Sequence, residues 1–312
     1  GDVNGDGYSD VLVGAPFFDA GAAEAGLVQL YLGSASGLSA TPNWTATGPE
    51  EGAQLGHSVA TAGDVNGDGY SDVVIGAPHI GAERGRGRAY LYLGSPAGLA
   101  GAPAWIGAVA NVYAFGQAVA TAGDVNGDGY ADVLVGAPGT LTNPHTSDVG
   151  WAYLYYGSPS GLASTPGWTA EVCAQNGRFG DSLGTAGDVN GDGYADVIVG
   201  AYGCDYERGR AYVYLGTAAG LSADPAWIGQ PPADGQMARY GSAVGTAGDV
   251  NGDGYADVVI GSPGYSGEHS NSGLVEVYFG GPSGLPATPN WTISGSAAND
   301  QLGSAVGTAG DV

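Results

Sequence analysis

The chain has 312 residues, of which 43% are hydrophobic, so it is long enough and apolar enough to bury a sizeable core. Its 31 acidic residues against 7 basic ones give a formal net charge of -24. This excess opposes nucleic-acid binding, because Lys and Arg supply that affinity. No run of about 18 apolar residues occurs, so no membrane insertion is expected.

A nine-residue motif, Asp-Val-Asn-Gly-Asp-Gly-Tyr-Ser/Ala-Asp, recurs along the chain and sets its organisation. Five complete copies begin at Asp2, Asp64, Asp124, Asp188 and Asp249. Asp311 and Val312, the last two residues of the sequence, match the first two positions of a sixth copy. The motif divides the chain into repeats 2-63, 64-123, 124-187, 188-248 and 249-310. A fixed period of this length is typical of propellers and solenoids.

Each repeat shows the same order of predicted strands. A short β-branched run such as Val73 to Ile75 follows the motif, as expected of a strand buried on both faces. An alternating segment such as Ala89 to Leu93 comes next. A third strand carries one tryptophan, and a fourth, rich in small residues, precedes the next motif. The tryptophans of the third strands are Trp44, Trp105, Trp168, Trp227 and Trp291, which we expect in the core or between blades.

Four short antiparallel strands per repeat, without helical periodicity, predict an all-β fold. We expect one β-propeller domain over residues 1-312, with five four-stranded antiparallel blades, and a solenoid is the alternative. The segment Gln301 to Gly310 matches the innermost strand of a blade, so we expect this C-terminal strand to complete the first blade and close the ring. Because Asp2 and Asp311 would both offer the first ligand of one loop, a portion of a longer array remains a second interpretation.

The motif has the oxygen pattern of a calcium loop. In the first copy, Asp2, Asn4, Asp6 and Asp10 supply side-chain oxygens, and Tyr8 can supply a main-chain carbonyl. Oxygen donors without Cys or His favour Ca²⁺ over zinc or copper. About five Ca²⁺ ions are therefore expected. The candidate ligands are Asp2, Asn4, Asp6, Tyr8, Asp10, Asp64, Asn66, Asp68, Tyr70, Asp72, Asp124, Asn126, Asp128, Tyr130, Asp132, Asp188, Asn190, Asp192, Tyr194, Asp196, Asp249, Asn251, Asp253, Tyr255 and Asp257.

An EF-hand and an ordinary hairpin turn are the two alternatives to a β-hairpin calcium loop. An EF-hand would carry a bidentate Glu at position 12 and helical flanks, whereas position 12 is here Val or Ile and the flanks are strands. We therefore expect Asp10 and its equivalents to take the role of that Glu. Ordinary Asn-Gly or Asp-Gly hairpin turns need only two or three such residues, whereas nine positions keep their pattern in five copies.

The residues around the motif resemble a known family. Phe115-Gly116 and Phe179-Gly180, together with the Gly-Ala-Pro segments that begin at Gly14, Gly76 and Gly136, are similar to FG-GAP repeats, the units of the integrin alpha-subunit propeller. The resemblance covers nearly the whole chain. It implies calcium on one face of the propeller and ligand recognition by loops on the opposite face. Integrin propellers have seven blades, whereas this chain shows five repeats.

The variable loops contain the remaining candidate features. Cys173 and Cys204 lie in the two variable loops that flank one pair of strands, so they are a candidate disulfide, as expected in an oxidising extracellular compartment. All seven basic residues are arginines in or beside such loops, namely Arg84, Arg86, Arg88, Arg178, Arg208, Arg210 and Arg239. They could receive an anionic ligand or could be solvated charges with local partners.

The sequence favours a binding module over an enzyme. The four His are scattered, no Ser-His-Asp grouping recurs and Lys is absent, so we expect no catalytic residues. We expect a secreted or cell-surface calcium-binding propeller for adhesion or structural interaction, with a protein or glycan ligand at the loop face. A carbohydrate-binding, lectin-like propeller is the alternative, and part of a polysaccharide-degrading enzyme is a less favoured third.

Overall fold

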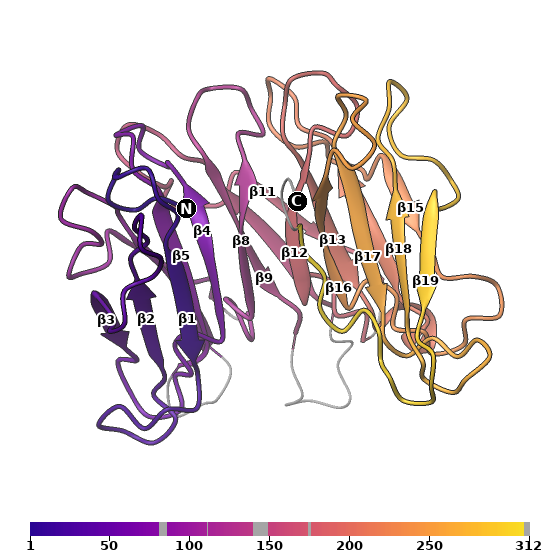
Figure 1. Ribbon diagram of the computed structural model, residues 1–312, viewed down its shortest axis with the longest axis horizontal. Helices are drawn as coiled ribbons and strands as arrows, with labels where there is room; N and C mark the ends of the chain where they lie inside the picture. The colour runs from indigo at the N-terminus through magenta and orange to yellow at the C-terminus, as the bar shows by residue number, and fades with distance from the viewer. Residues whose placement is uncertain (81–85, 111, 140–148, 174–175, 309–312) are drawn as a thin grey trace. The chain divides into compact units, whose positions relative to one another are not determined.

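The computed structural model describes residues 1-80, 86-110, 112-139, 149-173 and 176-308 (Figure 1). Its strands form five antiparallel sheets that follow one another along the chain, one for each sequence repeat. The all-β prediction, with one sheet per repeat, is confirmed. No helix in the described ranges has the length and apolar character that crossing a membrane would require.

The strands of each sheet pair in chain order. The first sheet contains β1 (Val11–Ala15), β2 (Leu27–Tyr31) and β3 (Trp44–Thr47). The second contains β4 (Ser58–Gly63), β5 (Asp72–Ile80), β6 (Arg86–Tyr92) and β7 (Trp105–Gly107). The third contains β8 (Ala118–Gly123), β9 (Asp132–Ala137), β10 (Trp151–Tyr155) and β11 (Trp168–Glu171). The fourth contains β12 (Ser182–Gly187), β13 (Asp196–Ala201), β14 (Arg210–Tyr214) and β15 (Trp227–Gly229), with the single turn α1 (Cys204–Glu207) before β14. The fifth contains β16 (Ala243–Gly248), β17 (Asp257–Ser262), β18 (Leu274–Tyr278) and β19 (Trp291–Ser294).

The first sheet differs from the others because it has three strands. Among the described residues, no strand pairs with the second edge of β1, and Val11 and Val13 are 40% and 46% exposed. The equivalent Val73 and Ile75 are buried, since β4 lies beside β5. The segment expected to complete the first sheet is described only as far as Thr308 and has no strand assigned to it. Ala309 and Gly310 lie outside the described residues.

The chain forms two compact units. One comprises Gly1–Thr121, Gly129–Thr140 and Tyr153–Gly167, and the other comprises Ala122–Asp128, Leu141–Ala152 and Trp168–Val312. The division falls at the end of the second repeat and within the third, so the first unit contains nearly all of the first two repeats, the second unit contains the last two, and the third repeat is shared. Organisation as one propeller domain remains a prediction.

A tryptophan joins neighbouring sheets in four of the five repeats. In the first unit, the Trp44 ring meets the edge of Tyr92 with ring centroids 4.9 Å apart, and the Trp44 Nε1 group donates a hydrogen bond of 3.0 Å to the carbonyl of Ala100. In the second unit, Trp227 meets Tyr278 in the same way and donates a hydrogen bond to a carbonyl of the next repeat. Trp105 and Trp168 make equivalent ring contacts. These four tryptophans therefore pack between blades, as predicted, whereas Trp291 is 48% exposed and the prediction is wrong for it.

The fifth sheet replaces an apolar contact of its neighbours by a polar one. Beside the fourth sheet, Phe179, just before β12, is buried against Tyr212 of β14 with ring centroids 5.7 Å apart. At the corresponding places of the fifth sheet, Tyr240 precedes β16 and Glu276 lies in β18. The Tyr240 hydroxyl donates to the Tyr278 hydroxyl at 3.1 Å, and that hydroxyl donates to Glu276 Oε2 at 3.4 Å. Burial raises the pKa of Glu276 to about 7.

This raised pKa predicts a pH-dependent effect of Glu276→Gln. Between the ordinary Glu pKa and about pH 7, the folded protein keeps a proton that the unfolded chain has lost, so Glu276 lowers stability as pH rises. Glu276→Gln should increase the free energy of unfolding at pH 8 by about 1 kcal/mol and change it little near pH 4.5. Denaturant titration at the two pH values measures this. The exposed control Glu268→Gln should show no such difference, and equal effects of Glu276→Gln at both pH values would contradict the assignment.

Candidate metal centres

The second motif shows how the first five positions of a loop are arranged. Asp64 Oδ1 accepts hydrogen bonds from the N–H groups of Gly67 and Asp68 at 2.7 and 3.1 Å, and Asp64 Oδ2 accepts one from Gly69 at 2.8 Å. The side chain of Asn66 donates to Asp68 Oδ2 at 2.9 Å. One carboxylate thus satisfies three main-chain donors of the turn, which is why the loop closes within so few residues.

The ninth position is buried and joins separate parts of the repeat. Asp72 Oδ2 accepts the N–H of Val65 at 2.9 Å, and Asp72 Oδ1 accepts the N–H of Gly94, beyond the end of β6, at 2.9 Å. Burial raises the pKa of Asp72 to about 6, the two hydrogen bonds oppose this rise, and the charges of Asp64 and Asp68 add to it. The three carboxylates of the motif therefore lie close enough to interact.

Successive loops are also linked to one another. The main-chain carbonyl of Asp64 accepts a hydrogen bond of 2.9 Å from Ala131, a residue of the next motif. The Tyr130 ring lies over Gly67, where an added Cβ would come within 2.7 Å of the ring, and Gly67 has a φ of +74°. In the second unit, the carbonyl of Asp188 likewise accepts a hydrogen bond from Ala256. Each motif is thus a connection between repeats as well as a turn.

The other loops repeat this pattern. The first, fourth and fifth copies form the same hydrogen bonds at the first, fifth and ninth positions, including those that Asp10, Asp196 and Asp257 accept. In the third copy the same bonds join residues 124-128, and Asp132 accepts the N–H of Gly157. Burial raises the pKa of Asp196 to about 7.

The donor chemistry of the loops fits a hard cation such as Ca²⁺. Each loop gathers three carboxylates and one amide within a single turn, with no sulfur or imidazole among them. The side-chain oxygens bond the N–H groups of the loop, and within the described ranges no three acidic, His or Cys side chains are already grouped as metal ligands. Asp64 Oδ1 accepts two of these hydrogen bonds, whereas Asp64 Oδ2 and both oxygens of Asp68 and Asp72 accept one each, which leaves them a second lone pair for an ion.

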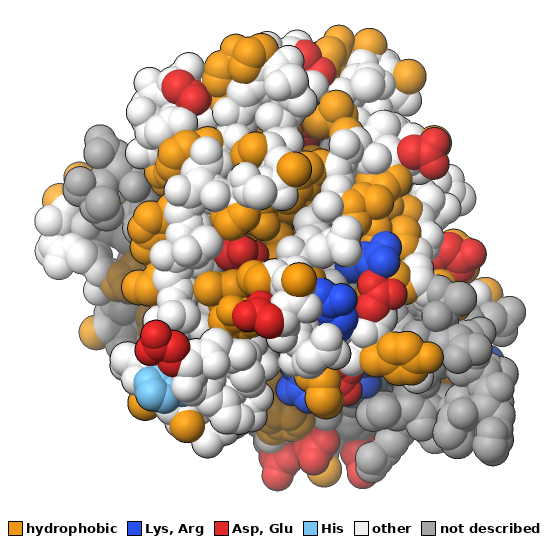
Figure 2. Space-filling view, turned by 90° about the vertical axis from the view of Figure 1, so that its right-hand side faces the viewer, with side chains coloured by type: hydrophobic (Ala, Val, Ile, Leu, Met, Phe, Trp, Pro, Cys, Tyr) orange, Lys and Arg blue, Asp and Glu red, His pale blue; other side chains and the backbone are white. Residues whose placement is uncertain are grey.

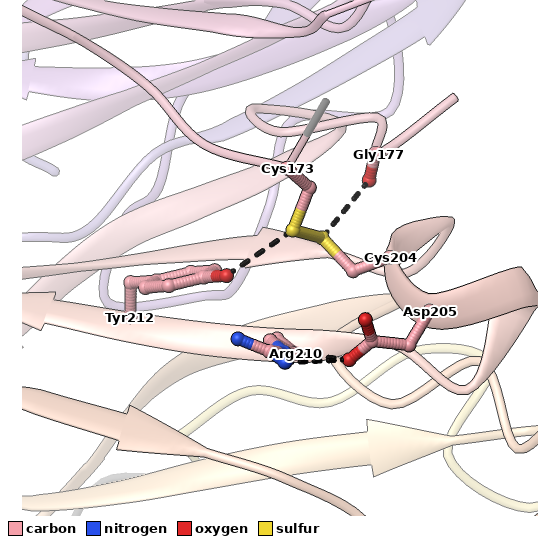
Figure 3. Close-up of polar contacts among 6 residues, drawn as sticks. All are labelled: Cys173, Gly177, Cys204, Asp205, Arg210 and Tyr212. Atoms are coloured by element: carbon pink, nitrogen blue, oxygen red, sulfur yellow. Dashed lines mark hydrogen bonds and ion pairs between the residues drawn. A yellow bond between two sulfur atoms is a disulfide. The ribbon is translucent and has the colours of Figure 1, made fainter. Parts of the chain in front are cut away.

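The long loops lie at the opposite ends of the strands from the motifs. One kind connects the second and third strands of a sheet, as between β13 and β14, and the other connects the last strand of a sheet to the first strand of the next, as between β11 and β12. In the second unit, a disulfide joins the predicted pair Cys173 and Cys204, whose Cα atoms are 5.8 Å apart (Figure 3). The Tyr212 hydroxyl donates to the sulfur of Cys173 at 3.3 Å. The disulfide thus fixes the turn α1 to the neighbouring loop.

The turn α1 has an unusual backbone. Asp205, Tyr206 and Glu207 all have positive φ angles of 52°, 60° and 63°. Each such residue costs roughly 1–2 kcal/mol relative to a right-handed conformation. Ion pairs hold the turn on both sides, from Arg210 to Asp205 at 2.7 Å and from Arg239 to Glu207 at 2.9 Å.

Arginine side chains gather near this turn. Arg178 lies 5.5 Å from the centre of the Tyr202 ring, and Arg208 donates to the carbonyl of Pro232 at 3.3 Å. Figure 2 shows arginines among acidic side chains in the lower part of one face of the molecule. The prediction of local acidic partners is therefore correct for Arg210 and Arg239, although their partners include Asp205 as well as Glu207. Arg84 lies outside the described residues.

Comparison with known proteins identifies the repeats. An FG-GAP-like repeat model matches residues 64-135, and an FG-GAP repeat model matches residues 1-31, 179-214 and 240-278. These matches show that the chain is an FG-GAP repeat protein, as the resemblance predicted.

The chain is similar to integrin alpha subunits. It is 36% identical to integrin alpha-V of Gallus gallus over 67% of this chain and 20% of the relative. It is 39% identical to integrin alpha-IIb of Homo sapiens over 51% of this chain and 16% of the relative. The chain thus spans at most a fifth of the length of these relatives. A solved structure titled "Structure of Dos1 propeller" aligns with a TM-score of 0.46 and 13% identity, covering 88% of this chain and 58% of that one.

The sequence did not reveal two roles of the motif residues. Tyr70, Tyr130, Tyr194 and Tyr255 were predicted only as carbonyl ligands, yet their rings cover glycines of the preceding motif. The ninth-position Asp was predicted as an ion ligand, yet it is also the acceptor for two buried N–H groups. The invariant Tyr-Gly spacing across repeats was the available signal for the first role, whereas the second depends on a residue more than 20 positions away.

Two substitutions in the second loop should separate hydrogen bonding from metal binding. Without calcium, Asp72→Ala leaves two buried N–H groups unpaired and should lower the free energy of unfolding by about 2–5 kcal/mol. Asp68→Ala, at an exposed position, should lower it by less than about 1 kcal/mol under the same conditions. Denaturant unfolding in a chelator measures both. Equal losses for the two variants would contradict the structural role of Asp72.

Proposed function

We propose that this chain is a calcium-binding β-propeller module of the extracellular space or cell surface, which acts in adhesion or structural interaction. The observation that carries the proposal is the division of each repeat into two ends. Acidic motifs of constant sequence occupy one end, and loops that differ in length and composition occupy the other. Variable loops on a constant scaffold are the usual place for recognition.

Calcium would be held in the second loop by Asp64, Asn66, Asp68 and the carbonyl of Tyr70, with Asp72 in the place of the EF-hand Glu. Equivalent residues would serve in the other four loops, giving about five ions. A bound ion supplies positive charge among carboxylates that otherwise repel one another. The residues themselves close the turn and connect it to the next motif, so the ion would stabilise the contact between repeats.

The ligand would be a protein bound by the variable loops. Similarity to integrin alpha subunits supports this choice over a glycan, as does the difference between loops in successive repeats. A lectin with one sugar site per blade should show the same polar and aromatic pocket in every repeat. The Cys173–Cys204 disulfide supports an oxidising compartment. No catalytic role is proposed.

Calcium removal tests the structural part of this proposal. Adding EGTA should lower the melting temperature by roughly 10 °C or more, because calcium stabilises only the folded chain. Restoring excess CaCl₂ should reverse the loss, while MgCl₂ should restore less. Metal analysis of the desalted protein should give about five Ca²⁺ per chain. A melting temperature unaffected by EGTA would refute the role of calcium in stability.

Binding arrays test the recognition part. The calcium-loaded protein should bind immobilised secreted or cell-surface proteins and should ignore a glycan array. Replacing a long loop by a short Gly-Ser connection should abolish binding, whereas the same replacement in a turn beside the motifs should preserve it. Binding to glycans alone would favour the lectin-like alternative.

A further inference from the structure

Left-handed backbone that does not recur between repeats is found at the disulfide. Several non-glycine residues with positive φ occupy equivalent places in different repeats, as Glu207 and Asn271 do, each two residues before a glycine. Cys173, Asp205 and Tyr206 have φ angles of 61°, 52° and 60°, and no non-glycine residue at the equivalent places in the described parts of the other repeats has a positive φ. The framework of the repeat therefore does not require this conformation. The feature that the three residues share is the disulfide that joins their two loops.

These two loops also touch through their main chains. The N–H of Gly203 donates a hydrogen bond of 3.2 Å to the carbonyl of Gly177, and a Cβ at Gly203 would overlap the carbonyl oxygen of Asn176. The Tyr206 side chain is 96% exposed, so no packing of its ring offsets the strain of its backbone. The cross-link therefore holds together a turn whose own residues do not favour the conformation they adopt.

The two sulfurs of the disulfide differ in burial. Cys173 is half-buried, whereas Cys204 is 1% exposed, so a thiolate has access to the sulfur of Cys173. One thiolate of a dithiol would attack that sulfur and break its bond to Cys204, and the second thiol would then release Cys173. Two electrons pass to the protein, both cysteines become thiols, and the dithiol becomes a disulfide. The carbonyl oxygen of Gly177, 3.9 Å from the sulfur of Cys204, can accept a hydrogen bond from the new thiol (Figure 3).

We propose that the Cys173–Cys204 disulfide is a redox switch for the shape of the turn α1. While the bond is intact, the turn stays left-handed and Tyr206 protrudes from it. After reduction by a dithiol, Asp205 and Tyr206 leave the left-handed region, because this relieves their backbone strain, and the ion pairs on both sides of Tyr206 are released. The switch acts on one long loop and does not depend on which ligand the module binds.

Limited trypsin digestion of the calcium-loaded protein tests the change of shape. The N–H of Gly209 donates to the carbonyl of Cys204, and the carbonyl of Arg208 accepts a hydrogen bond from the N–H of Tyr240, so the Arg208–Gly209 peptide bond is held in place. Dithiothreitol should speed cleavage of this bond at least about 10-fold, because cleavage follows the population of the open loop. Cleavage after Arg88, in β6, is the internal reference and should keep its rate.

A variant without the cross-link separates the effect of the bond from other actions of the reductant. The double substitution Cys173→Ser, Cys204→Ser should be cleaved after Arg208 as fast as the reduced native protein, with or without dithiothreitol. Equal cleavage of the oxidised and reduced native protein would overturn the proposal. Faster cleavage after Arg88 on reduction would also overturn it, because reduction would then unfold more than this turn.

Tyr206→Asn tests whether backbone strain drives the switch. Asn adopts left-handed backbone more readily than Tyr, so this variant should favour the disulfide form and lower the equilibrium constant for reduction by dithiothreitol about 5-fold. Tyr206→Phe is the matched control, which keeps the aromatic ring and should leave the constant unchanged. Mass spectrometry of acid-quenched samples in dithiothreitol redox buffers measures the ratio of thiol to disulfide. An unchanged constant for Tyr206→Asn would refute the role of strain in the switch.

Discussion

The structure depends on the carboxylate at the end of each motif, which is buried in four of the five copies and half-buried at Asp10. In the second repeat, Asp72 accepts a hydrogen bond from the N–H of Val65, at the start of the motif, and another from the N–H of Gly94, which follows β6. A single side chain thereby fixes the turn before β5 and the chain beyond β6. Loss of that acceptor would leave two buried donors unpaired, which is more costly than the loss of a surface hydrogen bond. The hydrogen bonds of this carboxylate therefore connect the turn of the motif, the start of β5 and the chain beyond β6.

The fold could be predicted from sequence because its signals are local and repeated. The motif spacing gives the number of sheets, and alternation such as Ala89 to Leu93 gives the strands. The three-stranded first sheet was not predicted in that form, because the residues expected to complete it lie about 290 positions from β1, and pairing over such a separation is not encoded in local pattern. Val11 and Val13 are exposed because, among the described residues, no fourth strand covers that edge of β1.

The candidate metal ligands could be predicted by residue type and spacing, but their contacts could not. The hydrogen bond from Gly94 to Asp72 spans 22 residues, and the cover of Gly67 by Tyr130 joins different repeats. Likewise, the pairing of the two cysteines followed from strand neighbourhood, whereas the left-handed turn beside Cys204 did not. Asp and Glu give little sign of such a backbone, and Tyr at its centre gives none. The ion pairs with Arg210 and Arg239 compensate for the missing local preference.

The link between successive motifs bears on how such chains change in length. The carbonyl of Asp64 and the glycine at position 67 contact residues at fixed positions of the following motif, and Asp188 and Gly191 do the same two repeats further on, in the second unit. Each motif therefore offers a main-chain N–H donor to the motif before it and a main-chain carbonyl acceptor to the motif after it. Gain or loss of a whole repeat conserves both surfaces, whereas a deletion of part of a repeat that includes the motif removes one of them. Repeat number can thus vary in evolution without redesign of the interfaces, while the length of each repeat is constrained.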